Sequence, residues 1–200
     1  MMNRKKFVFA IMAALLVCFL AHAASVAAEP AKATIEITGK KTIKAVKSGK
    51  AWTAVVDGKQ LSATPGGKGG FTLKSGAAIV AAGKTKEDKL KFRTKNGAFY
   101  MSLKFKTDKI KIGLKEDDPA PWEIKFYPDK TKVKRSEKEL GKINYYPENK
   151  KLKAKNAAGA TVAECKDLKK KSAALAPFLM DGLDSQKKAF LALILLAMDK

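Results

Sequence analysis

The stretch FYMSLKFKTDKIKIGLK, residues 99–115, decides the fold class of this chain. Apolar side chains occupy every second position on both sides of Thr107-Asp108, and lysine fills most of the positions between them. Strict alternation places one set of side chains in a core and the other set in water, as in a strand with one buried face. The stretch therefore predicts two consecutive strands joined by a short turn.

The same period of two recurs from Thr34 to Cys165. The apolar members of the other runs are Ile35 and Ile37, Leu90 and Phe92, Trp122, Ile124 and Phe126, Ile143 and Tyr145, and Leu152 and Ala154. Pairs such as Asp57-Gly58 and Asn96-Gly97 separate the runs, and these residues tolerate the positive φ values of tight hairpins. Many short strands at regular spacing predict an antiparallel meander, closed into a barrel or folded into a sandwich.

The alternation stops after Lys166, and two helices are expected beyond it. The first is a short helix over Ser172–Met180, interrupted near Pro177, and the second covers residues 186–198 after the capping residues Asp184 and Ser185. The second helix is apolar on every side, so it must cross a membrane or be enclosed by protein. Its ten apolar residues rise roughly 15 Å, about half of a ~30 Å hydrocarbon core, which favours enclosure.

These patterns together predict a mainly β fold. We expect a closed antiparallel β-barrel with the hydrophobic C-terminal helix enclosed in its interior. The alternative is an open sandwich with that helix packed outside. Lysine on the outward strand positions argues against an outer-membrane barrel, whose outward face must be apolar.

The N-terminus is typical of a secretory signal peptide over residues 1–28. Three basic residues precede the apolar run Phe7–Ala21, and small residues follow it up to Ala28. An uncleaved membrane anchor is the alternative, but the run is shorter than the ~20 residues that a spanning helix needs. Lipid modification of Cys18 is a third interpretation. We expect an exported protein, located in the periplasm or cell envelope or secreted, with a short linker at 29–33 and one domain at 34–200.

The order of these elements resembles the tubby C-terminal-like superfamily, which includes the LURP-one-related proteins and the phospholipid scramblases. The residues that carry the resemblance are the hairpin Leu152–Glu164 and the apolar helix Ala189–Asp199. The resemblance covers residues 34–200 and implies a closed barrel of about twelve strands around a hydrophobic helix. The familiar members act on cytoplasmic membrane faces, whereas this chain carries an export signal. No lipid-binding residue of the family is carried over to this chain.

The inventory of reactive side chains is small once residues 1–28 are removed. The remaining chain keeps Cys165 as its one cysteine and has no histidine. An intrachain disulfide, Ser–His and Cys–His nucleophile pairs, Cys/His zinc sites and a c-type haem attachment are therefore excluded. Cys165 is expected to be a small buried hydrophobe, with intermolecular pairing as the alternative.

Several local motifs lack the context that their chemistry needs. Gly83-Lys84-Thr85 ends like a P-loop, but no helix follows it, and Ser185-Gln186-Lys187-Lys188 lacks the companion motifs of penicillin-binding enzymes. Glu116-Asp117-Asp118 precedes two prolines and is interpreted as a solvated turn, not a calcium loop. Trp122 is expected in the core, whereas Trp52 is left open between the core and a ligand platform. No catalytic residue, metal or cofactor is predicted.

Among the global properties of the sequence, only the net charge indicates a function. The formal charge of the whole chain is +22, and nearly all of the positive charge is lysine. Without residues 1–28 the chain keeps 38 basic and 19 acidic residues. We expect a non-enzymatic exported domain that binds an anionic membrane surface or an acidic polymer weakly through exposed lysines. Nucleic acid is not expected, because arginine is rare. The alternative is a structural or protein-interaction module whose lysines serve solubility only. The oligomeric state is left open.

Overall fold

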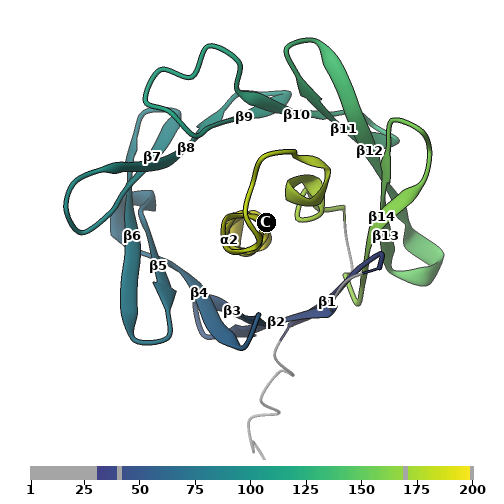
Figure 1. Cartoon of the computed structure of the whole chain (residues 1–200). Coiled ribbons are helices and arrows are strands. Elements are labelled where there is room, and N and C mark those ends of the chain that lie inside the picture. The colour runs from purple at the N-terminus through teal and green to yellow at the C-terminus, as the bar shows by residue number, and fades with distance from the viewer. Residues whose placement is uncertain (1–30, 40–41, 169–170, 199–200) are drawn as a thin grey trace, which may run out of the picture.

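The structure is a computed structural model that describes residues 31–39, 42–168 and 171–198, so the expected signal peptide lies outside the described residues. Fourteen strands form one closed antiparallel barrel in which each strand pairs with its neighbours in the sequence (Figure 1). The strands are β1 (Lys32–Ile37), β2 (Thr42–Ser48), β3 (Ala51–Val56), β4 (Lys59–Pro65), β5 (Phe71–Ser75), β6 (Ala78–Lys86), β7 (Lys89–Arg93), β8 (Phe99–Phe105), β9 (Lys109–Gly113), β10 (Trp122–Phe126), β11 (Lys130–Arg135), β12 (Lys138–Tyr146), β13 (Lys151–Asn156) and β14 (Thr161–Lys166).

Pairing between the first and last strands closes the barrel. Ile35 of β1 lies opposite Cys165 of β14, at the centre of a four-residue antiparallel ladder. Closure leaves no outermost strand with unpaired backbone groups along its length. The predicted barrel is therefore confirmed, and the open sandwich is wrong. The barrel has fourteen strands, where the tubby-like resemblance implies about twelve.

The alternation in the sequence separates the inner and outer faces as expected. Inward side chains such as Phe92, Met101 and Ile112 are fully buried. Trp52 and Trp122 are both buried in this core, which settles the open question about Trp52. Phe126 differs from the expectation, because it ends β10 and its side chain is 41% exposed.

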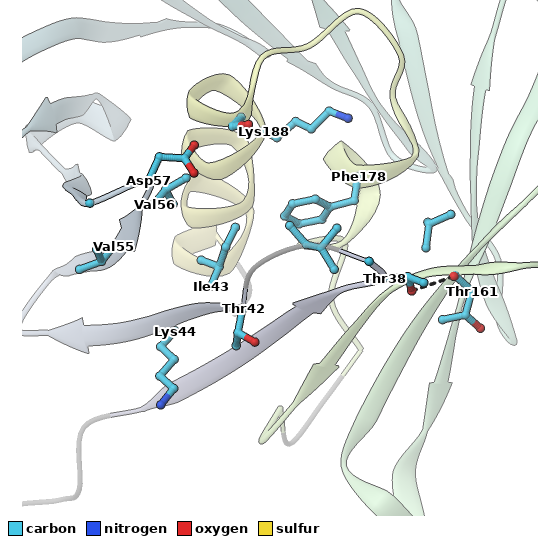
Figure 2. A pocket seen from close by; sticks show the side chains of 15 residues that line it. Thr38, Thr42, Ile43, Lys44, Val55, Val56, Asp57, Thr161, Phe178 and Lys188 are labelled. Carbon is cyan, nitrogen blue, oxygen red and sulfur yellow. Dashed lines mark hydrogen bonds between the residues drawn. The ribbon is translucent and has the colours of Figure 1, made fainter.

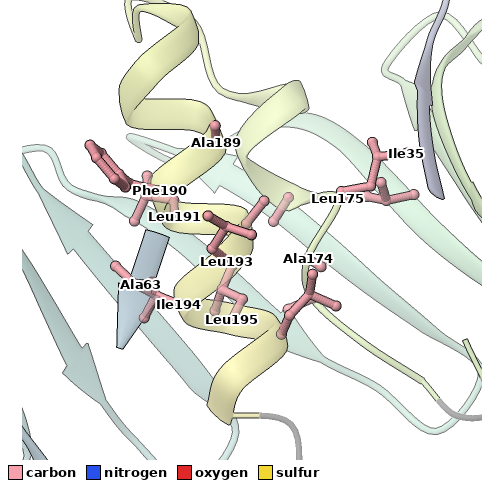
Figure 3. Close-up of a cluster of buried hydrophobic side chains, with 14 of the residues drawn as sticks. Ile35, Ala63, Ala174, Leu175, Ala189, Phe190, Leu191, Leu193, Ile194 and Leu195 are labelled. Carbon is pink, nitrogen blue, oxygen red and sulfur yellow. The ribbon is translucent and has the colours of Figure 1, made fainter. Parts of the chain in front are cut away.

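Helix α2 (Ser185–Met198) runs inside the barrel, and eight consecutive residues from Ala189 to Leu196 are buried. It packs mainly against β3 and β4, and Figure 3 shows its leucines and Phe190 directed into the surrounding core. The backbone N–H of Lys187 donates to Oδ1 of Asp184 at 2.7 Å, so Asp184 and not Ser185 caps the helix.

The helix expected over Ser172–Met180 is wrong in extent. This part of the chain contains only the 3-10 turn η3 (Ala176–Leu179), because Pro177 has no N–H to continue a helical ladder. The turn packs against β12, β13 and β14, across the interior from the strands that hold α2. Two further 3-10 turns, η1 (Gly67–Gly69) and η2 (Pro147–Asn149), lie between strands.

The segment between η3 and α2 is attached to the barrel wall through Trp122. The indole N–H of Trp122 donates to Oδ1 of Asp181 at 3.1 Å, and the guanidinium of Arg135 lies 4.2 Å from the Trp122 ring centroid. A hydrogen bond from the indole holds the pKa of Asp181 below its ordinary value, and the Arg135 charge adds to this effect. These contacts hold the segment that precedes α2 against the barrel wall.

Candidate functional site

Lysine is unevenly distributed around the outside of the barrel. Strands β9 to β13 hold eleven lysines among 31 residues, together with the two acidic residues Glu123 and Glu139. Strands β3 to β5, on the other side of the ring in Figure 1, hold two lysines among 18 residues and no acidic residue. The outward positions of those three strands are mostly threonine, serine, glutamine and valine. Positive charge is therefore concentrated on one side.

The register of these strands aligns lysines across the sheet. Five lysines lie directly opposite one another on five consecutive strands, and we call this row the lysine ladder: Lys109, Lys125, Lys132, Lys142 and Lys155. Adjacent strands lie about 4.8 Å apart, so the row spans roughly 19 Å. A second row meets the first at β9 and runs the other way, through Lys111, Lys104, Lys89 and Lys86.

Carboxylates neutralise only part of the ladder. Glu123 lies on β10, two residues before Lys125, and forms ion pairs with Lys109 at 3.2 Å, Lys111 at 2.8 Å and Lys125 at 3.8 Å. Glu139 pairs with Lys132 at 2.7 Å. Within the described part of the chain, no carboxylate lies within ion-pair distance of Lys142 or Lys155. The β12–β13 end of the ladder is thus its most strongly positive part.

The pKa values of Glu123 and Lys132 are shifted by their hydrogen-bond partners. Burial alone would raise the pKa of Glu123, but hydrogen bonds from Lys111 and Lys109 hold it below its ordinary value. The hydrogen bond from Lys132 to Glu139 raises the pKa of Lys132. The charges of Glu123 and Lys132 therefore remain fully developed at neutral pH.

A cavity of about 1140 Å³ is the second candidate site, and no sequence pattern indicated it. It lies between the β1–β2 and β3–β4 ends of the wall, Phe178 of η3 and the first turn of α2, as Figure 2 shows. Its apolar lining comprises Ile37, Ile43, Val55, Val56, Val162 and Phe178. Lys44, Asp57 and Lys188 supply its charged groups. This composition is that of a small-molecule pocket, mostly apolar with a few polar groups.

The local motifs do not converge on a site. Lys84 and Thr85 lie in β6, paired with β7, so no helix N-terminus is available there to hold a phosphate. Ser185 begins α2, and the Ser185–Lys188 turn lines the end of the cavity. Glu116 pairs with Lys91 at 2.9 Å and with Arg93, while Asp118 accepts the backbone N–H groups of Leu114 and Ala120.

Cys165 is fully buried on β14. Burial raises the pKa of its thiol to about 12, with a smaller contribution from the charge of Asp167. A thiol in this state is a poor nucleophile. The structure thus places Cys165 in the core, as a small hydrophobic side chain.

The described residues contain neither a metal-binding cluster nor a membrane-spanning helix. Among residues 31–39, 42–168 and 171–198, no three His, Cys, Asp or Glu side chains gather closely enough to hold a metal ion. Over the same ranges, no helix combines the length and apolarity needed to cross a membrane.

Comparisons of the chain with protein-family models, with curated proteins and with solved structures give no match. The lysine ladder and the cavity are therefore the features of this chain that indicate a function.

Proposed function

We propose that this protein is a non-enzymatic exported protein that binds an acidic polymer along the lysine ladder. The observation that carries the proposal is the alignment of five lysines on five adjacent strands. Ammonium groups repeated at about 4.8 Å can each meet a carboxylate or phosphate group of a linear polyanion. The partner has this repeating anionic chemistry.

The curvature of the barrel favours a flexible polymer over a flat membrane. The ladder covers four of the fourteen strand-to-strand steps around the closed ring, which is more than a quarter of the circuit. A flat membrane that touches the middle of the lysine ladder leaves the lysines at both ends of the ladder in solution. Because ion pairs across water are screened over about 8 Å at physiological salt, those distant lysines would contribute little to membrane binding. A polymer chain can follow the arc and contact every step.

The ladder is also a poor device for solubility alone. Like charges directly opposite each other on neighbouring strands destabilise a sheet. Alternating lysine and glutamate across the strands would keep the barrel soluble without that repulsion. The barrel wall nevertheless contains four successive lysine–lysine pairs. Their presence supports a role for the concentrated positive charge beyond solubility.

The resemblance to the tubby C-terminal-like superfamily stays part of the proposal. A closed barrel around a C-terminal helix supports it, whereas the strand number of fourteen differs from the family's pattern. Its lipid-binding activity is not proposed for this chain, because no lysine here can be matched to the family's ligand-binding residues.

The test compares two variants of equal net charge. In the ladder variant, Lys132, Lys142 and Lys155 are changed to Gln. In the control variant, Lys47, Lys59 and Lys74 on β2, β4 and β5 are changed to Gln. Binding of the purified protein to alginate, a linear polyuronate, is measured over a range of salt concentrations. We expect the ladder variant to lose at least tenfold in affinity and to show a weaker salt dependence, and the control variant to lose less than threefold.

Two results would contradict the proposal. Equal losses in the two variants would show that only the total charge matters, as the solubility interpretation requires. Tighter binding to phosphatidylglycerol vesicles than to alginate, lost in the ladder variant, would assign the ladder to a membrane surface instead. Neutral phosphatidylcholine vesicles serve as the control for binding that does not depend on charge.

A further inference from the structure

The wall of the barrel lacks part of its ladder between β2 and β3. The pairing of these strands runs from Ser48 opposite Ala51 to Ala45 opposite Ala54 and stops there. Yet β2 extends three residues further to Thr42, and β3 extends two residues further to Val56. Each strand stays paired on its other side, β2 with β1 and β3 with β4. We call this unpaired end of the interface the seam.

The cavity lies at the seam. Thr42, Ile43 and Lys44 line it from β2, and Val55, Val56 and Asp57 line it from the end of β3. Figure 2 shows residues of both segments around the pocket, together with Phe178 and the first turn of α2. The cavity therefore connects the outside of the barrel with the space beside the enclosed helix.

Apolar side chains around the cavity remain partly in contact with water. Four of the lining residues pack against the buried core but are only partly buried themselves: Ile37, Val56, Val162 and Phe178. Val55, on the outer lip of the seam, is 60% exposed and is among the most exposed large hydrophobic residues of the described chain. Contiguous apolar surface that is left in water marks a binding site, because covering it is favourable.

The size and charge of the site narrow the class of ligand. The seam is about three residues long, or about 10 Å along the strands, which suits the width of one hydrocarbon chain. That length is also too short to add a peptide strand, whose affinity depends on a run of main-chain hydrogen bonds. Among the described residues that line the cavity are two lysines and one aspartate, an excess of one positive charge.

We propose that the cavity binds a single-chain amphiphile with an anionic head group, whose hydrocarbon chain enters through the seam between β2 and β3. The chain lies against Ile43, Val56 and Phe178, beside the first turn of α2. The head group stays at the charged part of the lining. Pockets of about 300–1,000 Å³ hold drug-sized ligands, so a cavity of about 1140 Å³ has room for a long chain. This site is separate from the lysine ladder.

The first experiment measures binding of cis-parinaric acid, a fluorescent long-chain carboxylic acid, to the purified protein. Its methyl ester tests the need for an anionic head, and competition by palmitate or by hexadecyl phosphate distinguishes carboxylate from phosphate heads. We expect the acid to bind at least tenfold more tightly than the ester. Val56→Trp, which fills the cavity, should weaken binding at least tenfold. The matched control is Ile79→Trp, at a 52% exposed position on β6 that does not line the cavity.

The second experiment does not depend on filling the core. Val55→Cys places a thiol on the exposed lip of the seam, and Ile79→Cys places one at the control position. In protein that lacks residues 1–28, and hence Cys18, the native Cys165 does not react, because it is buried and its pKa is raised to about 12. We expect palmitate to slow maleimide labelling of Cys at position 55 at least fivefold and to leave labelling at position 79 unchanged. Absence of parinaric acid binding, or equal labelling at position 55 with and without palmitate, would overturn the proposal.

Discussion

Lys142 of β12 lies directly opposite Lys132 of β11 on the outer face of the barrel, with no intervening carboxylate in register. The neighbouring strand β13 places Lys155 opposite Lys142 on the other side. Lys142 is thus flanked by two like charges across the sheet. An arrangement of this kind lowers stability, and it concentrates positive potential on a part of the wall where Glu139 already pairs with Lys132.

Lys142→Glu should therefore stabilise the protein. The substitution turns two repulsive cross-strand pairs into attractive ones, each worth about 0.2–1 kcal/mol. Urea denaturation should show a higher free energy of unfolding, while alginate binding becomes weaker. Lys74→Glu is the matched control, because Lys74 faces Ser62 and Ile79 across its strands and relieves no lysine pair. A lower stability of Lys142→Glu than of the unchanged protein would contradict the repulsion argument.

Substitutions of Leu193 test whether α2 is enclosed by the barrel. Its side chain is 1% exposed in the barrel interior. Leu193→Ala should lower the free energy of unfolding by about 2–5 kcal/mol, the range for large-to-small changes in a core. Leu193→Lys should prevent folding, because an unpaired buried charge is far more costly. Ile79→Ala, at an exposed position, should change stability by less than about 0.5 kcal/mol. A soluble, folded Leu193→Lys protein would show that the helix can leave the barrel.

Substitution of Gly141 tests the close contact between η3 and the barrel wall. A Cβ at this position would lie 2.2 Å from the carbonyl oxygen of Lys155 and 2.8 Å from Cδ2 of Leu179. Because the first neighbour is backbone, rotation of a side chain cannot relieve the overlap. Gly141→Ala should therefore cost at least the ~1–3 kcal/mol typical of overpacking. At Gly67, nothing lies within 4 Å of an added Cβ, so Gly67→Ala should be nearly neutral. Equal melting temperatures of the two variants would refute this account.

Glu123 should make stability depend on pH. Its pKa is lowered from an ordinary value of 4.5 by hydrogen bonds from Lys111 and Lys109, which outweigh the effect of burial. The stabilisation is fully present above pH 4.5 and is lost as the pH falls through the lower folded-state value. Glu123→Gln should thus cost about 1 kcal/mol at pH 7 and almost nothing at a pH well below the folded-state pKa. Urea denaturation at both pH values measures this difference, and Glu148→Gln, on the exposed turn η2, serves as the control.

Local signals in the sequence predict the strands, their buried faces and the apolar helix, whereas closure of the barrel follows from the pairing of β1 with β14. Alternation of residues such as Leu103 and Lys104 assigns each strand residue to the core or to water without reference to any partner strand. The all-round apolarity of the helix favours enclosure, since its ten apolar residues are too few to cross a bilayer. A barrel filled by that helix could therefore be predicted. The helix expected over Ser172–Met180 was wrong because Pro177 outweighs local helix propensity.

The two candidate sites could not be predicted from the sequence, because both depend on the register of the strand pairing. Alternation places Lys132, Lys142 and Lys155 on the outer face, but it does not say that they lie opposite one another. A shift of two residues along one strand would keep every side chain on the same inner or outer face, but the lysines would no longer lie opposite one another. The same holds at the seam, where β2 and β3 lose their pairing beyond Ala45 and Ala54 while both strands continue. Residues that are adjacent only through strand pairing leave no periodic signal in the chain.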